Sequence, residues 1–454
     1  MDESSFIGRS AELDLLNDAW SSDRFELVIL YGRKRIGKTT LLSVFSEGKP
    51  TVYHSGQLGA RGPEMDNLFQ AISVGTLGDV GISFDSLTAS FHFLGERAKN
   101  ERLLFIIDEF PNFAQTITEA MSALQHAIDH QFGETKLMII LSGSSVSFME
   151  NEVLGHKSPL YGRRTLTLQL GPLSLAETAQ LCKRTPADSV AVHAMTGGIP
   201  FYVRAFSNPN ESLASAIEEV WFTPDGLLYQ EPQFFLALET RKSDQYLQLL
   251  TYLAGGANKA NQLAAKMQIS SAHLAALLST LKTLGIVTKE HPFGNKGKQS
   301  GIWTISDSLF AFHLRFVYPF IGKLEQGRNE SAVSILKEDL SSFIGRRFKE
   351  MCLQYFLQTT ELAITSVGRW WGSASEEEID FVAQDSEGTM VFGECKLTNT
   401  NVGMGEFETL KRRSMLVNNT AKREFWLFSK SGFTDELIRS KSARLVSLDE
   451  MVVQ

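Results

Sequence analysis

Short runs of apolar residues alternate with amphipathic helical patterns over the first 170 residues of the chain. Runs of this length and composition are typical of strands buried on both faces, as in a parallel sheet covered by helices. They lie at Phe25–Leu30, Thr51–Tyr53, Leu103–Ile107, Lys136–Leu141 and Thr165–Leu170. The pattern predicts an α/β fold with a parallel sheet.

The second half of the chain has two other patterns. Three helical segments are followed by two short strands, at residues 246–253, 261–266, 272–284, 286–289 and 302–305. Three helices and a β-ribbon predict a winged helix-turn-helix. Further on, an amphipathic helix at 343–356 precedes apolar strands at 379–383 and 390–397, with a turn between the strands. These elements predict a separate C-terminal α/β domain.

The first apolar run leads into a sequence that fits G-x-x-x-x-G-K-[ST] without a mismatch, Gly32-Arg33-Lys34-Arg35-Ile36-Gly37-Lys38-Thr39. The two glycines let the backbone N–H groups point at a phosphate, and the helix that continues with Thr40 adds its positive dipole end. Lys38 is predicted to reach the β- and γ-phosphates, and the Thr39 hydroxyl to hold Mg²⁺. Residues 32–40 are therefore a predicted nucleotide site.

A carboxylate pair, Asp108 and Glu109, ends the third apolar run, at the strand edge where ligands of open α/β sheets bind. Asp108 is predicted to hold Mg²⁺, and Glu109 to polarise the attacking water. Ser142-Gly143-Ser144-Ser145 follows the fourth run, and Ser144 or Ser145 is predicted to lie beside the γ-phosphate. A turn with an N-cap serine is the alternative.

Arg163 precedes the fifth apolar run. An arginine there could stabilise charge on the transferred phosphoryl group, either from within the chain or from a neighbouring molecule. A pair of surface arginines with Arg164 is the alternative. The glycine turn at 197–200 could be the hinge of a helical lid, or it could simply be the start of a helix with proline near its first position.

Together these motifs resemble a known family. In chain order they are FIGR, GRKRIGKTTLL, IIDEF, LSGSS, YGRR and GGIPFYV. The order is similar to that of the prokaryotic archaeal-type ATPases, which are P-loop proteins related to the AAA+ and STAND groups. The resemblance implies ATP as the nucleotide, and it implies that the FIGR segment lies over the adenine. No guanine-specific N-K-x-D motif is evident.

The predicted winged helix is poor in side chains that read bases. Its third helix carries Lys282 as its single basic residue, with Ser270, Ser271 and His273 near the start. Sequence readers usually present Arg, Lys, Asn or Gln to the major groove. Contact with DNA and docking of a protein therefore both stay open.

The C-terminal strands carry a second candidate site. Residues two apart on a strand share a face, so Glu394 and Lys396 project together, and a hairpin would bring Asp380 beside them. Two carboxylates suit a hard divalent cation, and Lys396 would orient water or stabilise charge on a phosphate. A surface salt bridge between Glu394 and Lys396 is the alternative.

The pattern D-x(13)-E-x-K after a helical glutamate resembles the PD-(D/E)xK nuclease fold. It also resembles the nuclease-like domain of unknown function that accompanies archaeal-type ATPases. On this resemblance Asp380, Glu394 and Lys396 are catalytic, and Glu350, Asp380 and Glu394 are metal ligands. The proline of the PD-(D/E)xK motif is absent from this sequence, and Ile379 occupies its position.

Composition narrows the class of protein. A length of 454 residues suggests roughly three domains. The net charge of −8 argues against a uniformly basic nucleic-acid binder but allows local basic patches. No apolar run approaches the ~20 residues of a membrane span, and the acidic start is no signal peptide. With three widely separated cysteines, these features predict a cytoplasmic protein without disulfides or membrane partners.

The predicted fold class is α/β: a P-loop NTPase parallel sheet with a helical lid, a winged helix-turn-helix and a C-terminal restriction-endonuclease-like domain. The predicted domains are the ATPase core at 1–170, the lid at 171–240, the winged helix at 241–308, a helical linker at 309–342 and the nuclease-like domain at 343–454. Two functions stay open. One is an Mg·ATP-controlled, metal-dependent enzyme that acts on DNA. The other is an ATP-driven switch whose C-terminal domain binds a protein partner or a second copy and cuts nothing.

Overall fold

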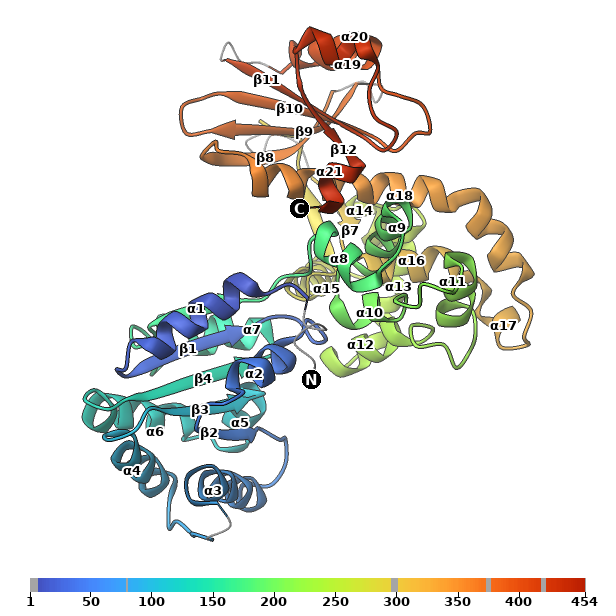
Figure 1. The fold of residues 1–454 in the computed structure, drawn as a ribbon. Helices are drawn as coiled ribbons and strands as arrows, with labels where there is room; N and C mark the ends of the chain where they lie inside the picture. The colour runs from blue at the N-terminus through green and yellow to red at the C-terminus, as the bar shows by residue number, and fades with distance from the viewer. Residues whose placement is uncertain (1–6, 79–80, 295–300, 373–376, 418–421, 454) are drawn as a thin grey trace. The chain divides into compact units, whose positions relative to one another are not determined.

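The computed structural model describes residues 7–78, 81–294, 301–372, 377–417 and 422–453. The chain divides into two compact units, residues 1–172 and residues 173–454. Figure 1 shows the first unit in blue to green and the second in green to red. Within the described residues, no helix is both long enough and apolar enough to cross a membrane.

The first unit is built on a five-stranded parallel sheet with the strand order β2-β3-β4-β1-β5. The strands are β1 (Glu26–Tyr31), β2 (Thr51–Ser55), β3 (Leu103–Asp108), β4 (Leu137–Gly143) and β5 (Leu166–Gln169). Every residue of β1, β3 and β4 is buried, which explains why these strands are near-continuous apolar runs. The predicted P-loop NTPase sheet is confirmed.

Helices of the first unit pack on this sheet. They are α1 (Ser10–Ser21), α2 (Lys38–Ser46), α3 (Arg61–Leu77), α4 (Leu87–Ala98), α5 (Phe110–Thr116), α6 (Ala120–Ala127) and α7 (Val146–Phe148), with short π-helical turns at Ile128–Phe132 and Met149–Val153. One core contains alternate residues of the central strands, such as Ile29, Phe105 and Ile139, together with Leu68 of α3 and Phe91 of α4. Every second residue of these strands therefore packs against the apolar faces of the helices, where apolar residues recur about every 3.6 positions.

The second unit begins with short helices and continues with three helices and an antiparallel ribbon. The short helices are α8 (Leu175–Cys182), α9 (Pro186–Thr196), α10 (Pro200–Arg204), α11 (Leu213–Trp221) and α12 (Glu231–Glu239). After them come α13 (Ser243–Ala254), α14 (Ala260–Met267), α15 (Ser271–Thr283), β6 (Val287–Glu290) and β7 (Ile302–Ile305). This is the element order predicted for the winged helix. The lysines at the predicted wing tip lie outside the described residues.

An aromatic helix and a long helix follow the ribbon. They are α16 (Ser308–Phe316) and α18 (Glu330–Thr359), separated by the short turns Tyr318–Phe320 and α17 (Ile321–Leu324). Phe312 and Phe316 of α16 each pack edge-on against Phe343 of α18, with ring centroids 5.6 Å apart. Because α18 is continuous over 30 residues, the domain boundary predicted between residues 342 and 343 falls inside a helix.

The C-terminal residues form a second five-stranded sheet, in the order β12-β11-β10-β9-β8. Its strands are β8 (Ile364–Trp371), β9 (Glu378–Asp385), β10 (Met390–Lys396), β11 (Arg423–Ser429) and β12 (Arg444–Ser447). The first three form an antiparallel meander, and the last two run parallel to β10. The helices α19 (Met404–Ser414) and α20 (Asp435–Ser440) connect the parallel strands. The predicted separate C-terminal α/β domain is confirmed as a mixed sheet.

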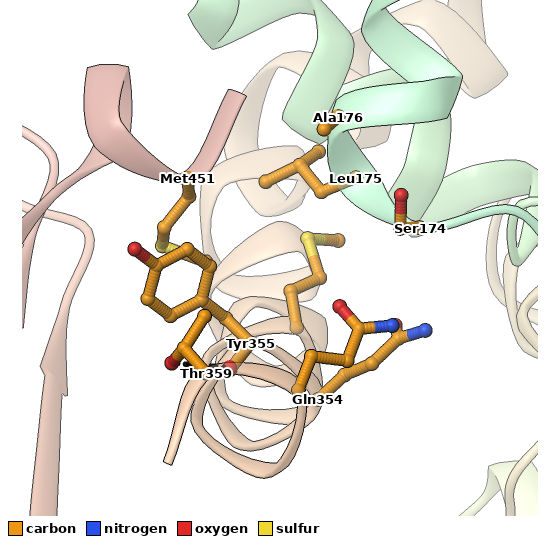
Figure 2. A pocket seen from close by; sticks show the side chains of 9 residues that line it. Ser174, Leu175, Ala176, Gln354, Tyr355, Thr359 and Met451 are labelled. Atoms are coloured by element: carbon orange, nitrogen blue, oxygen red, sulfur yellow. Dashed lines mark hydrogen bonds between the residues drawn. The ribbon is translucent and has the colours of Figure 1, made fainter. Parts of the chain in front are cut away.

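The terminal helix α21 (Leu448–Val453) contributes to a small pocket with α8 and α18. Figure 2 shows Met451 of α21 near Tyr355 and Thr359 of α18, with Leu175 of α8 beside them. The pocket has a volume of about 170 Å³. The Tyr355 hydroxyl donates a hydrogen bond to Glu450 at 3.1 Å, which fastens α21 to α18.

Candidate functional site

The P-loop joins β1 to α2 at the carboxyl end of the parallel sheet. Gly37 caps α2 with a φ of 96°, a left-handed conformation that favours glycine. At Gly32 a Cβ atom would lie 2.6 Å from the Leu170 carbonyl oxygen, so a larger residue would collide with the chain after β5. Residues 33–36 form the loop between these glycines, and Thr40 lies in the first turn of α2. The loop therefore ends at a helix N-terminus, an arrangement that binds phosphate.

The Lys38 side chain is folded across this loop and is only 5% exposed. Its ammonium group donates to the carbonyl oxygens of Gly32 at 3.0 Å and Arg33 at 3.3 Å. These contacts hold the positive charge inside the phosphate loop. The predicted position of Lys38 beside bound phosphates is therefore compatible with its position in the structure.

The Asp108 carboxylate lies beside the start of α2. Its Oδ2 accepts hydrogen bonds from the Thr39 hydroxyl at 2.9 Å and from the Tyr53 hydroxyl at 2.7 Å. A hydroxyl and a carboxylate are the hard oxygen donors that Mg²⁺ takes, and they already lie within one hydrogen bond of each other. Thr39 and Asp108 therefore fit the predicted Mg²⁺ site.

Glu109 and Ser144 come together across the ends of β3 and β4. The Ser144 hydroxyl donates to Glu109 Oε2 at 2.7 Å. Glu109 has a φ of 49°, so the backbone turns sharply between Asp108 and α5. Ser145 is the N-cap residue of α7, but its side chain makes no capping hydrogen bond. The predicted sensor and the predicted catalytic glutamate are direct neighbours.

Arg163 does not join this group. Its guanidinium forms two hydrogen bonds with the Asp129 carboxylate, at 2.7 and 2.8 Å. It precedes β5, whose Leu166 pairs with Val28 near the amino end of β1, whereas the P-loop follows the carboxyl end. Because the strands are parallel, Arg163 lies at the edge of the sheet opposite the P-loop, and the alternative of action within its own chain is not favoured by this position. Action on a neighbouring molecule stays a prediction.

The C-terminal hairpin brings the second candidate site together. Phe381 of β9 pairs with Gly393 of β10, so Asp380 lies opposite Glu394 at the next position of the register. Both carboxylates are 6% exposed. Lys396 contacts Glu394 Oε1 at 2.6 Å, and the Cys395 N–H donates to Asp380 Oδ2 at 2.8 Å. Antiparallel register thus converts the D-x(13)-E-x-K spacing into one cluster.

Glu350, the third predicted metal ligand, lies elsewhere. Its side chain is 62% exposed and pairs with Arg347 at 2.9 Å. The preceding residue, Lys349, contacts Asp380 Oδ1 at 2.6 Å instead. One residue is about 100° of rotation on an α-helix, so a one-position difference selects another face. The structure therefore does not bring Glu350 to Asp380 and Glu394, and among the described residues no group of three or more His, Cys, Asp and Glu side chains fits a metal ion.

Burial and neighbouring charges both shift the pKa values of the ionisable groups in this cluster. Burial and the nearby Asp380 carboxylate raise the pKa of Glu394. Its Oε2 atom is buried without a hydrogen-bond partner in the structure. Burial would lower the pKa of Lys349, but contacts with Asp380 and Glu378 outweigh burial and raise it. Lys349 is therefore held in its charged form beside the carboxylates.

Comparisons with known proteins identify both parts of the chain. Residues 24–179 match a family model described as an AAA domain, and residues 313–422 match one described as archaeal and bacterial proteins of unknown function. An uncharacterized protein of Methanocaldococcus jannaschii is 27% identical over 402 residues, which are 86% of this chain and 87% of that protein. The chain is an archaeal-type P-loop ATPase of the AAA group.

Two further similarities agree with this family. An uncharacterized ATP-binding protein of Methanocaldococcus jannaschii is 46% identical over 44 residues, 10% of this ATPase and 75% of that protein. The Walker-type ATPase of Pyrococcus abyssi has a TM-score of 0.52 and 19% identity, over 69% of this ATPase and 97% of that chain. At this identity the likeness shows the fold alone. The family model for proteins of unknown function includes Asp380, Glu394 and Lys396 of this ATPase.

Two side chains of the nucleotide site were not predicted individually. Arg9, which is 8% exposed, donates to the carbonyl oxygens of Ile36 and Gly171 and so ties the P-loop to the segment after β5. The FIGR motif contains Arg9, but its spacing does not reveal these partners. Tyr53 reaches Asp108 from the neighbouring strand β2, and that contact depends on the strand order.

Replacing Tyr53 with phenylalanine tests its contact with Asp108. The pKa of Tyr53 is raised by burial and by the Asp108 charge, so the hydroxyl stays a donor at neutral pH. Because this donor competes with a cation for Oδ2, we expect the variant to need about 3- to 10-fold less Mg²⁺ for half-maximal ATP hydrolysis. Titration of Mg²⁺ at saturating ATP measures this. Tyr161→Phe, at an exposed tyrosine, is the control, and an unchanged Mg²⁺ requirement in Tyr53→Phe would contradict the expectation.

Proposed function

We propose that this ATPase hydrolyses Mg·ATP and that the cycle controls a nuclease-like C-terminal domain that acts on DNA through the winged helix. The observation that carries the proposal is the cluster of Asp380, Glu394 and Lys396 at one end of the β9–β10 hairpin, in the same chain as an intact nucleotide site. The meander β8–β10, with α18 before it and a parallel β11 after α19, supports a restriction-endonuclease-like arrangement.

In the nucleotide site each side chain has a distinct proposed task. Lys38 binds the β- and γ-phosphates, and Thr39 and Asp108 hold Mg²⁺, which neutralises phosphate charge when it is bound. Glu109 orients the attacking water and attracts its proton as a general base. The Ser144 hydroxyl orients the Glu109 carboxylate through the hydrogen bond between them. Fixed charges and dipoles then stabilise the charge that develops during phosphoryl transfer.

A cleavage assay tests the proposed nuclease function. Single- and double-stranded DNA and RNA are incubated with Mg²⁺ or Mn²⁺, with and without ATP. We expect the wild type to cut DNA and Asp380→Ala and Lys396→Ala to lose at least about 100-fold of this activity, the scale of a catalytic group. Lys337→Ala, at an exposed lysine of α18, is the control. Cleavage that persists in both site variants would refute the proposal.

The second candidate function is an ATP-driven switch that cuts nothing. Lys349 favours it, because its ammonium group already pairs with the carboxylate that would take a cation. The exposed side chains of α15 also favour it, because they are mostly small and include Ala272, Ala275 and Ala276. This function predicts a change in mass or shape when ATP binds, measured by light scattering and small-angle X-ray scattering. Identical profiles with and without ATP would exclude it.

A further inference from the structure

A chain of ion pairs leads from the β6–β7 ribbon to the C-terminal carboxylates. Glu290 of β6 pairs with Arg369 of β8 at 3.1 Å, and Arg369 pairs with Glu378 of β9 at 2.9 Å. Glu378 also pairs with Lys349 at 3.0 Å, and Lys349 contacts Asp380 at 2.6 Å. Positive and negative groups alternate at every step of this chain.

The same region of α18 is fastened to the ribbon by backbone contacts. The Arg347 guanidinium donates to the carbonyl oxygens of Ile305 at 2.9 Å and Ser306 at 3.0 Å, at the end of β7. The Phe293 N–H, in the segment after β6, donates to the Arg369 carbonyl at 2.7 Å. Lys349 is two residues from Arg347, so one turn of α18 touches both the ribbon and Asp380.

The carboxylates by themselves have the donors of a cation site. Asp380 and Glu394 lie opposite each other, both are 6% exposed, and Glu394 Oε2 is buried without a partner. Two buried carboxylates with an unused oxygen call for a positive charge. Lys396 supplies that charge at Glu394, at 2.6 Å, and Lys349 supplies it at Asp380, where the sequence pattern leads one to expect a divalent ion.

We propose that Lys349 is an internal cation that blocks divalent-ion binding at Asp380 and Glu394, and that the Glu290–Arg369–Glu378 chain holds it there. This inference rests on the proposed function for its biological purpose, but not for its test. The first charge of the chain that holds Lys349 lies on the ribbon, at Glu290.

Binding of Mn²⁺ to the full chain tests the inference without any cleavage readout. Titration calorimetry is done with Asp108→Asn in the background of every variant, so that the nucleotide site, whose proposed cation ligands are Thr39 and Asp108, contributes equally little to Mn²⁺ binding. We expect Lys349→Met to bind Mn²⁺ at least about 10-fold more tightly, because methionine keeps the length of the side chain and removes its charge. Lys337→Met, on an exposed part of the same helix, is expected to leave the affinity unchanged.

The ion-pair chain makes a second, smaller prediction. Glu290→Gln removes the first charge, and we expect about a 2- to 5-fold gain in Mn²⁺ affinity, because partly exposed ion pairs contribute little each. In Lys349→Met the same substitution is expected to have no effect, because the blocking charge is gone. Unchanged Mn²⁺ affinity in Lys349→Met overturns the inference. Failure of DNA cleavage in Lys349→Met as well as in the wild type overturns only the proposed nuclease function.

Discussion

The Glu109→Gln variant is expected to bind ATP with wild-type affinity and to hydrolyse it about 100- to 10,000-fold more slowly. Glutamine has the size of glutamate, and its side-chain oxygen can still accept the Ser144 hydrogen bond that reaches Glu109 at 2.7 Å. It lacks the negative charge that draws a proton from the attacking water. Phosphate release at saturating ATP measures the rate, and a fluorescent ATP analogue measures the affinity.

The control for this variant is Glu134→Gln, at an exposed glutamate of the same unit. Its hydrolysis rate is expected to equal that of the wild type. Ser144→Ala separates orientation from proton transfer: it is expected to slow hydrolysis by about 10-fold, the scale of one hydrogen bond to a charged group. If Glu109→Gln hydrolysed ATP within tenfold of the wild type, another group would have to activate the water.

The second large effect is expected for Lys38→Ala, which should lose at least about 100-fold in ATP affinity and all measurable hydrolysis. A hydrogen bond to a charged group contributes about 1.5–3 kcal/mol, and Lys38 is predicted to contact two phosphates. The side chain is 5% exposed and held by two carbonyl groups of the loop, so its charge is already oriented in the protein. Equilibrium binding of labelled ATP measures the loss.

A thermal melt of Lys38→Ala without nucleotide shows whether the fold survives the substitution. Lys99→Ala is the matched control, because Lys99 is an exposed lysine of the same unit that pairs with Glu96 on the surface. Tight ATP binding by Lys38→Ala would mean that the loop at residues 32–39 is not the nucleotide site.

Local sequence patterns were sufficient to predict the conformation of the loop at residues 32–39 and the pairing of the β9–β10 hairpin. Strand, loop and helix follow one another directly around Gly32 and Gly37, and the tight turn needs glycine for reasons that lie within a few residues. In the same way, a hairpin of known register brings residues that are 14 positions apart into contact, as it does for Asp380 and Glu394. In both cases the positions of the candidate site residues depend on residues close in sequence or on the pairing of two adjacent strands.

Contacts between distant elements were not predictable in this way. The contact of Tyr53 with Asp108 follows from β2 lying next to β3, and Arg163 lies far from the P-loop because β5 runs parallel to β1. The choice of Lys349 over Glu350 depends on which side of α18 faces β9. A helix with weak amphipathic character does not reveal its rotation to within one residue.

The sequence by itself determined that this chain has a parallel P-loop sheet, a glycine-bounded loop at residues 32–40 that is the predicted nucleotide site, and a separate C-terminal α/β domain. These features depend on apolar runs, turns and motif spacing, which act over short stretches of chain. Only the tertiary structure decided which hydroxyl groups meet at Asp108 and which charged groups meet at Asp380. Those meetings depend on strand order and helix rotation, because electrostatic partners are selected by distance in space and not by distance along the chain.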